Sequence, residues 1–305
     1  MNQPLHVETI VKPDKKPNFL KRLFTRRREL NRTIWGDAGL FILLLLFGFF
    51  SAYPLIMTAS NAFKPLDELF LFPPKLLPRN LTLGNFKDLF ELIGNSWVPF
   101  SRYFFNTIFI TVLGTAGHVL FASMCAYPLA KYKFPGKTLF FTLVVYSLMF
   151  TPHVTSVPNY IIITRLGLID TFWAVVIPAI ASSLGLYLMK QFMEQIPDDL
   201  IESAKIDGAS EYRIFLQIVM PLVKPAWVTL IILLFQRLWT NTGGAFIFSE
   251  EKKPLSYALT QIAQGSIERA GTIAAVSFIM MIVPVTFFIV SQSKILETFT
   301  TSGMK

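Results

Sequence analysis

The stretch PDDLIESAKIDGASEYRIFLQIVMPLVKP, residues 197–225, is a long polar segment between apolar runs of the chain. Pro197 suits the start of a helix, and the acidic residues that follow it are favourable near a helix N-terminus. Gly208 can adopt the left-handed backbone that ends a helix, and Ser210 can cap a second helix that Pro221 stops. The sequence therefore predicts two short helices joined by a turn, which together form a helical hairpin.

The hairpin resembles the EAA loop of ABC-importer permeases, the segment that docks into the ATPase subunits. The resemblance rests on several constrained positions, which are Glu202, Ser203, Ala204, Asp207, Gly208, Ile218 and Pro221. The usual Glu-Ala-Ala of the family reads Glu202-Ser203-Ala204 here, and its Ile-x-Leu-Pro reads Ile218-Val219-Met220-Pro221. The resemblance implies that these residues couple the chain to an ATPase.

Two other interpretations of the hairpin are an ordinary surface hairpin and a helix-turn-helix that binds DNA. A helix that reads DNA needs a basic face. Residues 190–226 contain four Lys or Arg against six Asp or Glu, and they lie between apolar spans. The charge balance therefore favours docking to a protein, and we expect no nucleic-acid partner.

The composition indicates an all-α, polytopic membrane protein. Of 305 residues, 53% are hydrophobic and only 15% are charged. A spanning helix needs ~20 mostly apolar residues. The stretches that approach this length are residues 35–57, 103–130, 138–162, 171–192, 226–248 and 272–292. We therefore expect six transmembrane helices. The resemblance of the hairpin implies that it is a cytoplasmic coupling loop, the arrangement of a type I ABC importer permease.

The charge distribution predicts the orientation. The first 35 residues hold nine Lys or Arg against three Asp or Glu, directly before the first apolar run. Such a cluster keeps a segment on the cytoplasmic side, and six spans return the C-terminus to that side. The expected parts are a basic cytoplasmic tail (1–34), a first transmembrane helix (35–58), an external loop (59–102), a core permease domain (103–293) with coupling loop 197–225, and a cytoplasmic C-terminal tail (294–305).

The sequence contains no recognisable motif for a nucleotide-binding site, a metal site or an internal disulfide. Gly136-Lys137-Thr138 ends like a phosphate-binding loop, but the glycine required five positions before Gly136 is Lys131. Cys125 is the one cysteine, and three histidines form no metal-ligand pattern. We therefore expect no cofactor in this chain and ATP hydrolysis in a separate subunit.

Two further segments are similar to maltose-type carbohydrate ABC-transporter permeases: residues 127–137, which resemble the cytoplasmic turn of that family, and residues 165–171, which resemble its short external link. Together with the hairpin, the resemblance covers most of residues 103–293. It implies a multi-pass subunit of the bacterial cytoplasmic (inner) membrane. The implied partners are a second homologous permease subunit, two ATP-binding subunits, an external solute-binding protein and an oligosaccharide substrate, within a lipid bilayer.

The fifth apolar run is interrupted by polar residues that are candidates for a substrate path, namely Gln236, Arg237, Trp239 and Asn241, with Tyr160 on another span. An arginine at mid-membrane costs about 2.5–3.5 kcal/mol on insertion scales, so it usually faces a water-filled cavity or a partner. The alternatives are pairing with a carboxylate of a neighbouring subunit and a position at the membrane interface. If Arg237 faces the cavity, we expect a hydroxyl-rich solute stacked on the Trp239 indole. A neutral oligosaccharide is the general expectation, and an acidic oligosaccharide is the alternative.

Two other functional classes remain open on the sequence. An ion-coupled secondary carrier is expected to show inverted repeats and acidic groups at mid-membrane, and neither is found. An intramembrane enzyme is expected to show a nucleophile paired with a histidine, and no such motif surrounds His118.

Overall fold

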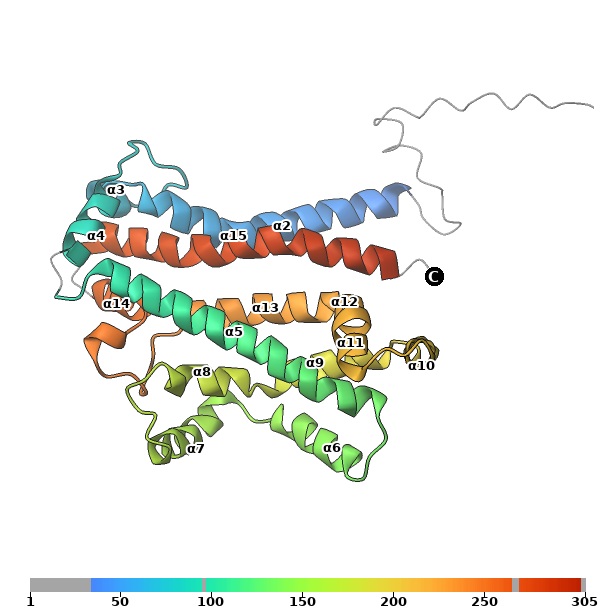
Figure 1. Cartoon of the computed structure of the whole chain (residues 1–305). Helices are drawn as coiled ribbons and strands as arrows, with labels where there is room; N and C mark the ends of the chain where they lie inside the picture. The colour runs from blue at the N-terminus through green and yellow to red at the C-terminus, as the bar shows by residue number, and fades with distance from the viewer. Residues whose placement is uncertain (1–33, 95–96, 265–268, 303–305) are drawn as a thin grey trace, which may run out of the picture. The chain divides into compact units, whose positions relative to one another are not determined.

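The computed structural model describes residues 34–94, 97–264 and 269–302, and no strand occurs among them. The chain divides into two units, residues 1–54 and 55–305, and the packing described below lies within the second unit. The predicted basic tail lies outside the described residues up to residue 33, and the predicted C-terminal tail does so from residue 303. In chain order the elements, most of which Figure 1 labels, are α2 (Ile34–Ala62), α3 (Leu66–Leu69), α4 (Gly84–Gly94), α5 (Phe100–Lys131), α6 (Lys137–Ser147), α7 (Pro152–Arg165), α8 (Trp173–Ile180), α9 (Ser183–Glu194), α10 (Asp198–Ile206), α11 (Glu211–Ile214), the π-helix η1 (Phe215–Val219), α12 (Met220–Leu222), α13 (Lys224–Trp239), the 3-10 helix η2 (Glu250–Lys252), α14 (Leu255–Ala263) and α15 (Ala270–Ser302).

The described helices include four that are long and apolar enough to cross a membrane. They are residues 36–62, 100–131, 173–194 and 270–291, and each overlaps a span expected from the sequence. Two further pairs, α6 with α7 and α11–α12 with α13, pass the same test only as bent pairs. The prediction of an all-α, multi-pass membrane protein is therefore confirmed, with up to six spans if each bent pair is one span.

The predicted span 138–162 is not one continuous helix, and this prediction was wrong in form. Helix α6 ends at Ser147, α7 begins at Pro152, and the two helices are bent by 111°. Proline lacks a backbone N–H and disfavours helical geometry in the residue before it. Thr151 accordingly has an extended backbone with ψ 153°. Pro152 thus starts a new helix in a new direction.

The predicted span 226–248 is also corrected, because α13 ends at Trp239. The chain then turns through Gly243 and Gly244, whose φ values are +79° and +49°. Such left-handed geometry is readily adopted by glycine. The Asn241 side-chain oxygen also accepts a hydrogen bond from the Gly243 N–H at 2.7 Å, which stabilises the turn. The polar run therefore lies at the end of a helix and in the loop after it.

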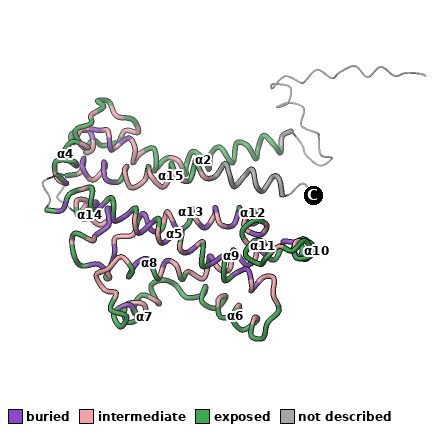
Figure 2. Tube along the Cα trace, in the orientation of Figure 1, coloured by how far each residue is buried: buried purple, intermediate pink, exposed green. Residues whose placement is uncertain are grey.

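Helix α5 packs against α8, α9 and α13, and α15 packs against α13, α4 and α14. Helices α10 and α11 lie at one end of α5, whereas α4 and α14 lie at its opposite end (Figure 1). Buried residues concentrate along α5, α8, α9 and α13, while α6 has none and α7 has only Ile163 (Figure 2). The expected external loop 59–102 contains the short helices α3 and α4.

The loop after α13, residues 240–254, is here called the strap, and Asp170 holds one side of it. The Asp170 Oδ1 atom accepts hydrogen bonds from the backbone N–H groups of Phe248 at 2.9 Å and Ser249 at 2.8 Å. Its Oδ2 atom accepts from the Ser249 hydroxyl and from Lys252 Nζ at 3.0 Å. Burial raises the pKa of Asp170, but the bonds from Ser249, Lys252 and Phe248 outweigh burial and hold that pKa well below its usual value.

Helix α5 holds the other side of the strap. Asn106 Nδ2 donates to the carbonyl oxygens of Glu251 at 2.8 Å and Lys253 at 2.9 Å. The Leu255 N–H, just after the strap, donates to Thr107 Oγ1 at 2.7 Å. The strap is therefore fixed to two different parts of the second unit.

Asp170→Ala is expected to loosen the strap and to cost about 1.5–3 kcal/mol of local stability, the usual contribution of a hydrogen bond to a charged group. Hydrogen exchange at the Phe248 and Ser249 amides would measure this loss of local stability. Because the folded pKa is lowered, the stabilisation is complete at neutral pH and is lost only as the pH falls below the usual 3.8 towards the folded value. Asp67→Ala, which removes an exposed carboxylate on α3, is the control, and equal exchange in both variants would contradict the role of Asp170.

Candidate functional site

The predicted hairpin is present, and its turn is a Schellman motif at the end of α10. Gly208 has φ +79°. Its N–H donates to the Lys205 carbonyl at 3.0 Å, and the Ala209 N–H donates to the Ala204 carbonyl at 3.0 Å. This pair of bonds satisfies carbonyl groups that a helix end leaves free. The prediction that Gly208 ends the first helix is confirmed.

The second arm of the hairpin differs from the prediction in two details. Ser210 occupies the N-cap position of α11, but its side chain makes no capping hydrogen bond. Pro221 does not stop the arm, because it lies inside α12, and the chain bends by 74° only at Val223. The π-helix η1 directly precedes α12, whose second residue is Pro221. A wider turn accommodates a residue that lacks the N–H and whose ring crowds the preceding turn.

Two ionic contacts hold the hairpin in place. Lys131, at the end of α5, places its Nζ 2.7 Å from Asp198 Oδ1 at the start of α10. Lys205 Nζ lies 2.8 Å from Glu211 Oε1 across the turn, and the Tyr127 hydroxyl donates to Glu211 Oε2 at 3.2 Å. The Lys131 ammonium lowers the pKa of Asp198, and the Lys205 ammonium lowers the pKa of Glu211. Both carboxylates therefore remain charged at neutral pH, and both contacts persist there.

The underside of the hairpin is apolar and buried. Ile201 of α10 and Ile214 of α11 belong to one cluster with Ala126 of α5 and Met193 of α9. Burial of an Ile or Met side chain contributes roughly 1.5–3 kcal/mol relative to exposure. The underside of the hairpin is thus packed onto α5 and α9.

The outer face of the hairpin exposes large apolar side chains beside charged ones. Ile206 is 86% exposed and Tyr212 is 78% exposed, on opposite sides of the Gly208 turn. Of the predicted docking residues, Glu202, Ser203, Asp207, Gly208 and Pro221 are exposed, whereas Ala204 and Ile218 are half-buried against the core. Exposed apolar surface with a charged rim is typical of a protein-binding site.

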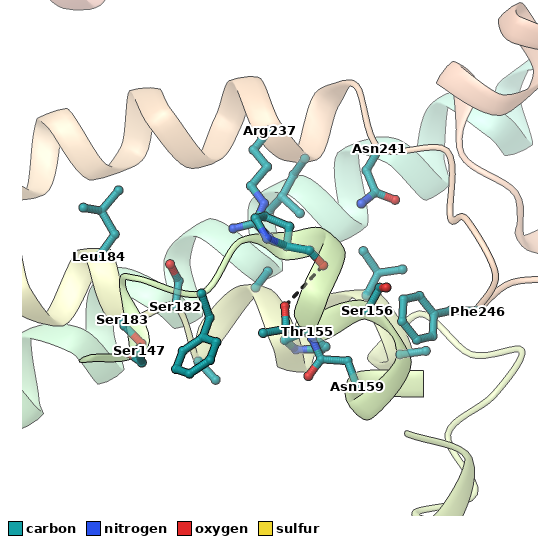
Figure 3. Close-up of a pocket in the computed structure, with 18 of the residues that line it drawn as sticks. Ser147, Thr155, Ser156, Asn159, Ser182, Ser183, Leu184, Arg237, Asn241 and Phe246 are labelled. Atoms are coloured by element: carbon teal, nitrogen blue, oxygen red, sulfur yellow. Dashed lines mark hydrogen bonds between the residues drawn. The ribbon is translucent and has the colours of Figure 1, made fainter. Parts of the chain in front are cut away.

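A cavity of about 540 Å³ lies where two helix breaks and one helix end meet, namely the break between α6 and α7, the break between α8 and α9, and the end of α13 (Figure 3). Its polar lining consists of Ser147, Thr155, Ser156, Asn159, Ser182, Ser183, Arg237 and Asn241. Backbone that departs from a helix at membrane depth is tolerated where it lines a cavity or is covered by protein. The geometry therefore suits a polar solute within the membrane domain.

The structure brings together only part of the predicted substrate path. Arg237 and Asn241 line the cavity, and Gln236 and Trp239 do not. Trp239 is only 3% exposed, and its indole stacks on the Phe235 ring at 5.8 Å inside the core. The expected stacking of a solute on this indole is therefore contradicted, because the face that such a solute needs is covered.

Tyr160 lies beside the cavity rather than in its lining. Its ring centroid is 6.2 Å from that of Phe246, a strap residue that does line the cavity. None of the five Ser and Thr side chains in the lining was predicted from the sequence. A proline at Pro152 and the Ser182-Ser183 pair inside an apolar run are the signals that mark the two helix breaks.

Comparison with known proteins identifies the family. The sequence pattern of "Binding-protein-dependent transport system inner membrane component" matches residues 118–301, which is more than half of the chain. The chain belongs to this family of permeases. It is 34% identical over 217 residues to "Protein LplC" of Bacillus subtilis (strain 168), covering 70% of this chain and 71% of that protein. It is 29% identical over 274 residues to "Galactooligosaccharides transport system permease protein GanQ" of the same organism, covering 87% of this chain and 94% of GanQ.

A solved structure shares the fold of the permease. It is the "Crystal structure of a bacterial ABC transporter involved in the import of the acidic polysaccharide alginate", with a TM-score of 0.73 and 22% identity. The match covers 88% of this chain and 99% of that one. The permease is therefore a multi-pass inner-membrane component with the type I importer fold, and it works with a solute-binding protein and an ATPase carried on a separate subunit.

Proposed function

We propose that the permease is one of two homologous subunits that together form the path for an oligosaccharide, with one ATP-binding subunit docked on the hairpin of each. In this arrangement both chain termini and the hairpin are cytoplasmic, and the strap faces the external solute-binding protein. Lys131, Lys133 and Lys137 support the orientation, because these basic residues lie next to the hairpin end of α5.

The polar lining of the cavity is the observation that supports an oligosaccharide as the substrate. Hydroxyl and amide side chains from the two helix breaks and from the end of α13 surround it, with Asn159 and Asn241 as the amides. Such groups donate and accept hydrogen bonds in the pattern that a solute with many hydroxyls requires. GanQ is named as a galactooligosaccharide permease, which supports a carbohydrate. A neutral oligosaccharide is the general expectation.

Reconstitution tests this function. The full complex, with both permeases, the ATPase subunits and the solute-binding protein, is placed in proteoliposomes, and uptake of a labelled oligosaccharide is measured. We expect uptake that requires both ATP and the binding protein. Uptake that proceeds without ATP and follows an imposed ion gradient would instead favour a secondary carrier.

An acidic oligosaccharide is the second candidate, and Arg237 favours it. The Arg237 side chain extends from α13 into the cavity (Figure 3). Within the described part of the chain, its guanidinium makes no hydrogen bond and no ion pair. Ser182 and Ser183, at the N-terminus of α9, line the same cavity, and the Ser182 side chain makes no capping bond there. A cation beside an uncapped helix N-terminus suits a carboxylate.

Arg237→Gln is expected to lower uptake of a uronate-containing oligosaccharide by about tenfold or more, because a charge-assisted contact is lost. Uptake of a neutral oligosaccharide of equal length is expected to change by less than about threefold, because neutral hydrogen bonds contribute less. Arg237→Lys keeps the charge without the planar fork and gives an intermediate loss for the acidic solute. Equal loss for both solutes would remove the acidic substrate and leave the permease function in place.

A further inference from the structure

The break between α8 and α9 leaves a helix end inside the protein, and His118 of α5 occupies it. Helix α8 ends at Ile180 and α9 begins at Ser183. The last carbonyl groups of a helix lack partners within that helix. His118 Nδ1 lies 2.8 Å from the Ile180 carbonyl oxygen, and His118 is only 1% exposed. Because a carbonyl oxygen can only accept, Nδ1 carries the hydrogen and the imidazole completes the end of α8.

The other side of the same imidazole fits against Gly185 of α9. A Cβ atom at Gly185 would lie 1.7 Å from His118 Nε2 and 2.4 Å from its Cε1. No other residue type fits that position while the ring is present, because real Cβ atoms do not approach that closely. His118 Nε2 has no hydrogen-bond partner among the described residues. The ring therefore bonds one half of the broken span and packs tightly against the other half.

The residues held by this arrangement form one wall of the cavity. Ala181, Ser182, Ser183 and Leu184 run directly through the break, and all of them line the cavity. The Ser183 hydroxyl also lies 2.6 Å from the Ser147 hydroxyl at the end of α6, which connects the two helix breaks. The imidazole thus contacts the residues on both sides of this wall, Ile180 and Gly185.

We propose that His118 is a positioning residue for transport, which holds the α8–α9 break in the geometry that presents Ser182 and Ser183 to the solute. This inference rests on the proposed function, because it assigns the cavity to the solute. His118 does not touch the solute in this arrangement, since it is covered by the wall that it supports. A histidine that serves only to fill the core is the competing explanation.

Four variants separate positioning from packing. His118→Leu keeps much of the volume but removes the donor, and His118→Asn keeps a donor near the place of Nδ1. Gly185→Ala introduces the clash, and the double variant Gly185→Ala with His118→Ala removes the clashing ring. Each is assembled into the full complex, and solute transport and solute-stimulated ATP hydrolysis are measured on the same preparation. Complex assembly checks folding.

For His118→Leu we expect transport to fall by about tenfold and hydrolysis by less than about twofold, because the solute is misplaced while the hairpin remains intact. His118→Asn is expected to recover most of the transported solute per ATP. Gly185→Ala is expected to lose transport, and the double variant to regain part of it. A parallel fall of transport and hydrolysis, no difference between Leu and Asn, or no recovery in the double variant would overturn the inference. Failure of the wild-type complex to take up any oligosaccharide with ATP would instead overturn the proposed function.

Discussion

Gly208→Val is expected to abolish association of the ATPase with the permease while leaving membrane insertion intact. The cause is backbone strain rather than lack of space, since a Cβ at Gly208 would meet nothing within 4 Å but φ is +79°. The left-handed region costs an ordinary L-residue about 1–2 kcal/mol, and a β-branched residue fits it worst. Relief of that strain requires a change in the angle between α10 and α11, which separates Ile206 from Tyr212. Affinity capture of the ATPase subunit on detergent-solubilised permease would measure the loss.

Gly208→Asn is the matched variant, because asparagine tolerates the left-handed region better than other residues with a Cβ. It is expected to retain most of the association. Equal amounts of the wild type and both variants in the membrane fraction would show that insertion is unaffected. If the valine variant captured as much ATPase as the wild type, the hairpin turn would not be needed for docking.

The hairpin was predictable because its signals are local. These signals are a left-handed glycine, acidic residues at a helix start and a proline. Each acts on the backbone within a few residues, so its effect can be predicted from the sequence alone. The prediction for Pro221 was wrong because the effect of this proline is not decided locally. The sequence shows that proline interrupts a regular helix, but the π-helix that accommodates Pro221 depends on packing, including the bond from Trp227 Nε1 to the Met220 carbonyl at 3.1 Å.

The cavity was less predictable because it is assembled from distant segments. Ser147, Ser183 and Arg237 come from three different helices, and the apolar character of a run says nothing about a change in its direction. Trp239 shows why neighbours in the sequence do not predict the lining of the cavity. Its place beside Arg237 in the sequence suggested a shared cavity, but the two side chains leave α13 in different directions, and Trp239 packs on Phe235. Only the tertiary structure decides which face of the helix lines the cavity.

Glu202→Ala is expected to weaken coupling between ATP hydrolysis and transport. Glu202 is exposed on α10, and it makes no hydrogen bond or ion pair with the described residues. It lies one turn before Ile206, so both side chains share a face of the helix. Lys205, the nearest cation on α10, is already engaged by Glu211 at 2.8 Å. The Glu202 carboxylate is thus available for a basic residue of the ATPase.

A charge-assisted pair that becomes buried at an interface costs about 2–5 kcal/mol when one partner is truncated. We therefore expect uptake by the reconstituted Glu202→Ala complex to fall by at least tenfold, with weaker association of the ATPase. Glu202→Gln keeps the shape and a hydrogen-bond acceptor without the charge, so its result separates a charged contact from a steric one. Glu91→Ala is the control, because it removes an exposed carboxylate from α4 at the opposite end of α5 and is expected to leave uptake unchanged. Unchanged transport and hydrolysis in Glu202→Ala would mean that this carboxylate is only a solvated charge on the helix, and the apolar tip formed by Ile206 and Tyr212 would then have to account for docking by itself.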